Sequence, residues 1–145
     1  MLNCEKHSSQ DRKLLKSSGL KVTRGRLEFL DALAHAGRPL SISAMSLKLG
    51  DKGVDLATLY RNADALEQLG LIKRVNLNSR EAYYELSGGR HHHHLTCVSC
   101  GRLEDLDICG VRLSSPLLKK HGFKKLLDHS LEFFGLCAKC AKASR

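Results

Sequence analysis

Hydrophobic residues in the first third of the chain recur at helical spacing. The segment 11–22 (DRKLLKSSGLKV) predicts a short basic helix that ends at Gly19. Thr23 is a suitable N-cap for a second helix. This helix stops at Gly37 and Pro39, and its apolar stripe consists of Leu27, Leu30, Leu33 and Ala34. The pattern therefore predicts two helices before residue 40.

The most regular amphipathic segment is Asp55–Leu69, which follows a shorter helix opened by Ser41 or Ser43 and closed by Gly50. Asp55 is a suitable N-cap. The inward stripe is expected to comprise Leu56, Leu59, Ala63, Leu66 and Leu69 or Gly70. The residues outside it lie in the N-terminal half of the helix and are Thr58, Tyr60, Arg61 and Asn62. That polar half is the part of the helix expected to be functional.

Beyond this helix the pattern changes from helical to alternating. The turn Asn78-Ser79 separates two alternating runs, which consist of Val75 and Leu77, then Ala82, Tyr84 and Leu86. Such runs predict a β-hairpin. Three helices followed by a two-stranded hairpin form a winged helix-turn-helix, in which Asp55–Leu69 would enter the DNA major groove.

Gly88-Gly89 is the strongest boundary signal in the chain. We predict a winged-helix DNA-binding domain at 1–87, a hinge at 88–90, and a dimerisation and metal-binding domain at 91–145. The last is expected to contain strands in HLTCV, GRLEDLD and FKKLLDHSLEFFG, and a helix from Cys109 to His121. So small an αβ unit buries little core, so a zinc staple and dimerisation would help it. The expected fold class is α+β.

The charge, hydropathy and cysteine content of the chain limit the kinds of function that it can have. The 145 residues carry a net charge of +9, which indicates a polyanionic partner or, alternatively, only a solvated basic surface. The sequence has no apolar run that could cross a bilayer and no signal-type N-terminus, so we expect a cytoplasmic protein without a membrane partner. Six cysteines in such a chain indicate metal binding rather than disulfides.

Four of the cysteines form two Cys-x-x-Cys pairs, Cys97–Cys100 and Cys137–Cys140. Four thiolates complete a tetrahedral zinc site without an open position, which makes the site structural. The alternative, a redox dithiol, normally needs one pair only. Cys4 and Cys109 have no partner at ligand spacing and are expected to be ordinary thiols.

A run of histidines, 91–94, directly precedes the first cysteine pair. In a strand, His92 and His94 would face one way, and His91 and His93 the other. With Glu85 and Asp105, the first two form a nitrogen and oxygen donor set suited to Fe²⁺, Mn²⁺, Zn²⁺, Co²⁺ or Ni²⁺. A solvated histidine tract beside a zinc site is the alternative. His129 is available to His91 and His93 on the opposite face.

These features together resemble the ferric uptake regulator (Fur) family. The matching segments are GLKVTRGRLEFLDAL, DLATLYRNADALEQLGLI, YYELSGGRHHHHLTCVSCG and DHSLEFFGLCAKC, in the family's order along nearly the whole chain. The resemblance implies a dimeric, metal-dependent repressor that binds a double-stranded DNA operator. It implies structural Zn²⁺ at Cys97, Cys100, Cys137 and Cys140, and regulatory Fe²⁺ or Zn²⁺, with Mn²⁺ possible, at Glu85, His92, His94 and Asp105.

The resemblance also implies roles for other residues. Tyr60 and Arg61 would contact DNA together with Thr58, and the backbone contacts would come from Lys16, Lys21, Arg24 and Arg26. A third family metal site matches at His91, His93 and His129, but its usual acidic ligand is replaced by Arg112, so we expect that site to be weak or absent.

Two further positions depart from the family pattern. Ser41 stands where many relatives have a metal-binding histidine, and His35 is not expected to replace it. Gly25 stands in place of the proline between Arg24 and Arg26.

Two other functional classes compete with this reading. An enzyme is not expected, because a zinc deaminase needs an open zinc position and an H-x-E with P-C-x-x-C, neither of which occurs. A zinc-stapled RNA-binding or adaptor module would need no metal-responsive hinge. Within the family, the acidic residue Glu85 favours an iron-type regulator of metal-homeostasis genes, and a zinc-uptake-type regulator is the alternative.

Overall fold

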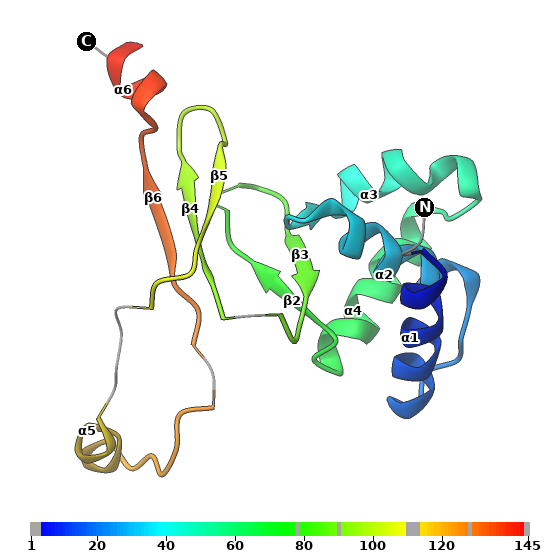
Figure 1. Ribbon diagram of the computed structural model, residues 1–145, viewed down its shortest axis with the longest axis horizontal. Helices are drawn as coiled ribbons and strands as arrows, with labels where there is room; N and C mark the ends of the chain where they lie inside the picture. Colours follow the sequence, from blue (N-terminus) through cyan, green and yellow to red (C-terminus); the bar gives the residue numbers. More distant parts are fainter. Residues whose placement is uncertain (1–3, 78, 90, 110–113, 128, 144–145) are drawn as a thin grey trace. The chain divides into compact units, whose positions relative to one another are not determined.

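The computed structural model describes residues 4–77, 79–89, 91–109, 114–127 and 129–143. The chain divides into two compact units, Met1–Gly89 and Arg90–Arg145, which are described separately (Figure 1). Both units combine helices with a small sheet, which confirms the α+β class. None of the helices in the described residues is long and apolar enough to span a membrane.

The first unit begins with helices α1 (Cys4–Ser17), α2 (Arg24–Ala36), α3 (Ile42–Leu49) and α4 (Leu56–Gln68), with the short 3-10 helix η1 (Gly50–Lys52) after α3. Side-chain caps start three of them. Thr23, Ser41 and Asp55 accept hydrogen bonds from the backbone N–H three residues ahead, at 3.4, 3.2 and 2.8 Å. Each bond satisfies an N–H that the first helical turn leaves without a partner.

A three-stranded sheet completes the winged helix. Its order is β1 (Leu40–Ser41), β3 (Tyr83–Leu86) and β2 (Ile72–Val75), with antiparallel pairing throughout. The predicted two-stranded hairpin was therefore incomplete, because a two-residue strand carries too little pattern to be read from sequence. The strand predicted around Val75 and Leu77 also lies earlier, and ends at Val75. Asn78 of the predicted turn lies outside the described residues.

The core of this unit is a single apolar cluster to which all four helices and the sheet contribute. Its fully buried large side chains are Leu15, Phe29, Leu30, Met45, Leu49, Leu59, Leu66 and Ile72. Three assignments for α4 were wrong. Leu56 and Leu69 are exposed because they lie at the ends of the helix, beyond the core, and Asn62 is buried. Helix α2 passes close to Asn62 at Gly25, where a Cβ would lie 3.4 Å from the Asn62 Nδ2 atom.

The second unit has a mixed sheet in the order β5 (Leu103–Leu106), β4 (His93–Cys97) and β6 (Glu132–Gly135). Strand β4 is antiparallel to β5 and parallel to β6. A long connection containing α5 (Ser115–Lys120) joins β5 to β6, and α6 (Ala138–Ala143) follows β6 (Figure 1). The parallel pairing aligns Cys97 with Gly135, which are far apart in sequence.

Two element boundaries in this unit differ from the prediction. The helix expected from Cys109 to His121 is the shorter α5, which starts at Ser115 with Pro116 in its first turn. Residues 110–113 of the expected helix lie outside the described residues. The strand expected across FKKLLDHSLEFFG is confined to β6, because only that segment pairs with β4.

Candidate metal centres and nucleic-acid interface

The four cysteines of the two Cys-x-x-Cys pairs come together at one end of the second sheet. Cys97 is the last residue of β4, Cys140 lies on α6, and Cys100 and Cys137 lie in the adjoining turns. The four sulfur atoms are within 4.8 Å of one another. Because β4 and β6 run parallel, their carboxyl ends lie at the same edge and bring the two pairs together despite their separation in sequence.

The sulfur geometry matches a tetrahedral ion. A zinc–sulfur bond of ~2.3 Å sets an edge of ~3.8 Å between thiolates in a regular tetrahedron. The Cys100 Sγ and Cys137 Sγ atoms are 3.8 Å apart. The residues present therefore fit one zinc ion, and four thiolate ligands leave no position for a substrate.

Backbone N–H groups prepare the thiols for metal binding. The N–H of Cys137 donates to Cys97 Sγ at 3.3 Å and, with the N–H groups of Cys100 and Ser99, lowers the pKa of Cys97 to about 6. The N–H of Cys140 lowers the pKa of Cys137. The Ser99 hydroxyl acts to lower the pKa of Cys140, but the neighbouring thiols of Cys137 and Cys100 outweigh it and raise that pKa to about 11. One sulfur atom is thus ionised near neutral pH, and another requires the metal to lose its proton.

The histidine run separates into two pairs with opposite orientations, as the alternation of a strand predicts. The His92 and His94 rings lie 4.9 Å apart between centroids, and the His91 and His93 rings 4.6 Å apart. His93 and His94 are buried, with 2% and 4% of their surface exposed. Buried imidazoles with acidic or imidazole neighbours favour a bound cation.

The carboxylates predicted for the regulatory site lie on two strands. Asp105 is opposite His94 in the β4–β5 pairing, with its Oδ1 atom 3.6 Å from His94 Nε2. Glu85 lies on β3 of the first unit, where it is buried and forms an ion pair with Lys73 at 2.9 Å. A cation that recruits Glu85 would therefore compete with the Lys73 ammonium group.

A further donor cluster lies on the opposite face of β4. It contains His91, His93 and His129, as the family resemblance suggests, and also Cys109. Cys109, which has no partner at ligand spacing in the sequence and was expected to be an ordinary thiol, has its Sγ atom 3.0 Å from His129 Nε2. No spacing pattern predicts this contact, because twenty residues separate Cys109 from His129. Arg112, expected to replace an acidic ligand here, lies outside the described residues.

The predicted DNA-contacting residues of α4 are held at its N-terminal end. Tyr60 is half exposed and Arg61 is exposed. The Thr58 hydroxyl donates to Asp55 Oδ2 at 2.8 Å and accepts from Arg61 Nη2 at 3.4 Å. Two hydrogen bonds from the Thr58 backbone and side chain lower the pKa of Asp55 and keep this cap ionised. Tyr60 and Arg61 are therefore available to a ligand, whereas Thr58 mainly orders the helix start.

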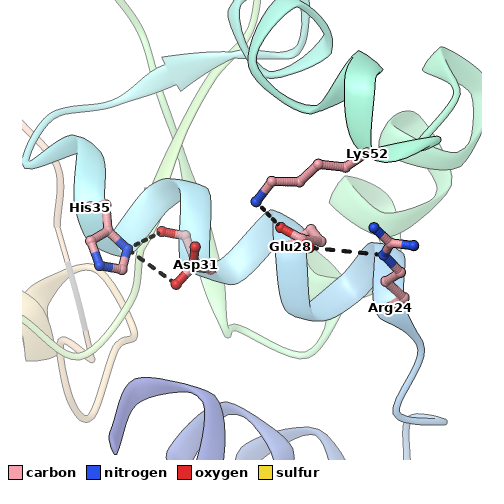
Figure 2. Close-up of polar contacts among 5 residues, drawn as sticks. All are labelled: Arg24, Glu28, Asp31, His35 and Lys52. Carbon is pink, nitrogen blue, oxygen red and sulfur yellow. Dashed lines mark hydrogen bonds and ion pairs between the residues drawn. The ribbon is translucent and has the colours of Figure 1, made fainter. Parts of the chain in front are cut away.

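The remaining predicted phosphate contacts differ in their surroundings. Lys16 and Lys21 are exposed. Arg24 is largely exposed and lies 4.0 Å from Glu28, which also pairs with Lys52 (Figure 2). Arg26 is half buried and donates from Nη1 to the Lys21 carbonyl at 2.7 Å, so it fixes the backbone before α2.

The position of the missing family histidine has a structural role. Ser41 is buried and caps α3 through its hydroxyl. His35 lies on α2, where its Nδ1 atom is 2.9 Å from the Asp31 carbonyl oxygen and 3.1 Å from the Asp31 carboxylate (Figure 2). The nearest histidine in sequence is thus engaged within its own helix.

A winged helix with an exposed polar recognition helix, joined to a unit with clustered thiols and imidazoles, defines a metal-responsive DNA-binding regulator. The ferric uptake regulator family model matches residues 17–134. The ferric uptake regulation protein of Neisseria meningitidis serogroup A is 37% identical over 136 residues, covering 90% of this chain and 94% of the relative. The chain belongs to the ferric uptake regulator family, whose members are DNA-binding transcription regulators and not enzymes.

Solved structures agree with this membership. The ferric uptake regulator from Francisella tularensis, solved with iron, has a TM-score of 0.66 and 28% identity, covering 85% of this chain and 96% of that one. A zinc uptake regulator complexed with zinc and DNA has a TM-score of 0.65 and 22% identity, covering 99% of each chain. The second likeness concerns the fold alone. These comparisons establish the family of the chain but do not identify its regulatory metal.

Proposed function

We propose that this chain is a repressor of metal-homeostasis genes that binds an operator as a homodimer when its regulatory metal is bound, with iron as the preferred ion. The observation that carries the proposal is the pairing of His92 with His94, whose rings lie 4.9 Å apart, beside Asp105. This donor set opens the second unit immediately after the winged helix. It is therefore suited to couple metal binding to the placement of the DNA-binding unit.

The proposed regulatory site consists of Glu85, His92, His94 and Asp105. Two imidazoles and two carboxylates form a set that accepts Fe²⁺, Zn²⁺ or Mn²⁺. Glu85 belongs to the winged-helix unit and the other three to the second unit. Shared ligation would restrict the separations that the two DNA-binding units of a dimer sample. Metal and DNA then stabilise each other by the same coupling free energy, commonly ~1–3 kcal/mol.

Exposed apolar side chains in the second unit support dimerisation. Those with substantial exposure are Leu95, Val98, Ile108, Leu117, Phe123, Leu126, Leu127, Phe133, Phe134 and Leu136. A monomer rarely leaves so many apolar groups in water without a partner. On the DNA side, Arg61 and Tyr60 would reach base edges or phosphates from α4, and Lys16, Lys21 and Arg24 would contact the backbone.

The proposal is tested by titrating operator DNA with the purified dimer in Fe²⁺, Zn²⁺ and Mn²⁺. We expect metal to tighten binding ~5–150-fold, in line with the usual range of coupling. His92→Ala and Glu85→Ala should remove that gain while leaving metal-free binding unchanged. His121→Ala is the matched control, since His121 is an exposed histidine after α5.

Two results would reject the proposal. One is metal-dependent DNA binding that survives both substitutions. The other is binding to RNA or protein, but not duplex DNA, with or without metal, which would favour the adaptor alternative. A strong response to Zn²⁺ without one to Fe²⁺ would identify the zinc-uptake type. Arg61→Ala should weaken DNA binding at every metal concentration, whereas Lys139→Ala on α6 should not.

A further inference from the structure

We propose that Cys109 supplies a thiolate as the fourth ligand of a metal site with His91, His93 and His129, where the family resemblance implies a site with an acidic ligand instead. The four donor atoms lie within 4.8 Å of one another. All four residues belong to the second unit. The site is separate from the four-cysteine centre and from the proposed regulatory site, and it does not depend on the regulatory role of the latter.

The contacts within the cluster converge on a common centre. The Nε2 atoms of His91 and His93 are 3.0 Å apart, and Cys109 Sγ is 3.0 Å from His129 Nε2. The His129 ring also lies close to both histidines in tilted arrangements, with centroid distances of 4.5 Å to His91 and 5.3 Å to His93. Four donors therefore point into one small volume, as a four-coordinate ion requires.

The surroundings favour ligation over simple hydrogen bonding. His93 is 2% exposed, so its ring nitrogens have little access to water and need partners within the protein. A neutral imidazole is the form that binds a metal. One divalent ion could contact all three rings and the thiol, because their donor atoms lie within 4.8 Å of one another.

The sulfur ligand changes which ion the site selects. Three imidazoles and one thiolate suit Zn²⁺ or Co²⁺, whereas Mn²⁺ prefers oxygen ligands. The absence of an acidic residue at Arg112 therefore does not leave the set incomplete, because Cys109 occupies the fourth position. We expect this site to hold Zn²⁺ under conditions in which the regulatory site can accept Fe²⁺.

The location of the ligands gives the site a structural consequence. Cys109 follows β5 and His129 precedes β6, so these two residues bracket the long connection that carries α5. His93 is the first residue of β4, the central strand, and His91 lies two residues before it. Ion binding would join both ends of the connection to the middle of the sheet and should protect the connection from proteolysis.

The test uses the full-length protein with its four-cysteine centre filled with Zn²⁺, titrated with Co²⁺. Cobalt binds more weakly than zinc to such sites, so it should not displace the zinc. We expect a sulfur-to-cobalt charge-transfer band at one extra ion per chain. Cys109→Ser should abolish that band, and His129→Gln should weaken it. Cys4→Ser is the matched control and should retain it.

Further measurements separate this site from the proposed regulatory site and from misfolding. His94→Ala should leave the sulfur-to-cobalt band unchanged, even where metal-dependent DNA binding is lost. Circular dichroism should show that Cys109→Ser keeps its helix content. The proposal is overturned if the wild type shows no such band once the four-cysteine centre is filled, or if the band survives Cys109→Ser.

Discussion

The two units of this protein are held together by different physical means. The first unit buries fifteen hydrophobic side chains in one cluster drawn from its helices and sheet. In the described part of the second unit, Cys97 is the one buried residue of hydrophobic type, and its other buried residues are His93, His94 and Thr96. The buried positions of β4, the central strand, are thus occupied largely by side chains that are able to bind a metal, rather than by aliphatic groups.

This difference shows where each unit obtains its stability. A cluster containing Phe29, Leu30 and Leu59 stabilises the first unit through burial, at ~25 cal/mol for each Å² of apolar surface removed from water. The second unit is too small and too open for that source to suffice. Metal ligation and a partner subunit are the remaining sources, because structural zinc contributes ~10–16 kcal/mol of binding free energy in small domains.

Removal of the structural zinc should have the largest effect, and it should affect the second unit alone. Cys137→Ser, or a strong chelator, should unfold the second unit and leave the first folded. Hydrogen exchange of the full-length protein should then show protection lost in β4, β5 and β6 and retained in α2 and α4. Cys4→Ser provides the control for loss of a thiol. Equal loss of protection in both units would mean that the winged helix also depends on the metal.

Truncation of the apolar core should have the next largest effect. Leu59 is fully buried on α4, so Leu59→Ala should lower the free energy of unfolding of the first unit by ~2–5 kcal/mol. Leu47 on α3 is 88% exposed, and Leu47→Ala should change it by less than ~0.5 kcal/mol. Denaturant titrations followed by helix content measure both. Similar losses of unfolding free energy in the two variants would show that Leu59 does not lie in the hydrophobic core.

The second unit alone should respond to mild acid. The pKa of Cys97, about 6 in the folded protein, is depressed from an ordinary value of 9.0. Ionisation of this thiol therefore stabilises the fold fully above pH 9, and the contribution is lost as pH falls through about 6. In the metal-free protein, protons therefore compete with Zn²⁺ for Cys97 below about pH 6, so zinc uptake, followed with a colorimetric chelator, should weaken below that pH while α4 remains helical.

Zinc binding should also release protons at neutral pH, because the pKa of Cys140 is raised to about 11 in the absence of metal. Calorimetry in buffers of different ionisation enthalpy measures this release. A binding enthalpy that does not vary with the buffer would contradict the assigned ligation.

The smallest expected effect concerns Ser41, the position at which many relatives have a histidine. Since the Ser41 hydroxyl caps α3, Ser41→Ala should lower the free energy of unfolding by ~1 kcal/mol. Metal-dependent DNA binding should be unchanged relative to wild type. A loss of metal response larger than the loss of stability would show that Ser41 takes part in the regulatory site.

Local rules accounted for the elements with strong sequence signals. Helix α4 begins after Asp55, as predicted, because a single side chain supplies the cap. The opposite orientation of the two histidine pairs follows from the alternation of a strand. Strand β1 has only two residues and forms by pairing with β3, so the local sequence could not predict it. The burial of Asn62 could not be predicted either, since it depends on the approach of α2.

The family was identifiable from the sequence alone, which also predicted a boundary at Gly88-Gly89 and grouped the four cysteines of the candidate zinc centre. These features depend only on residue identity and on short spacings along the chain, both of which can be seen in the sequence. Only the tertiary structure brought Cys109 to His129, because their proximity arises from the return of the chain to pair β6 with β4. Contacts made across a long connection produce no regular spacing in the sequence. Cys109 was therefore expected to be an ordinary thiol, and only the structure makes it a candidate ligand.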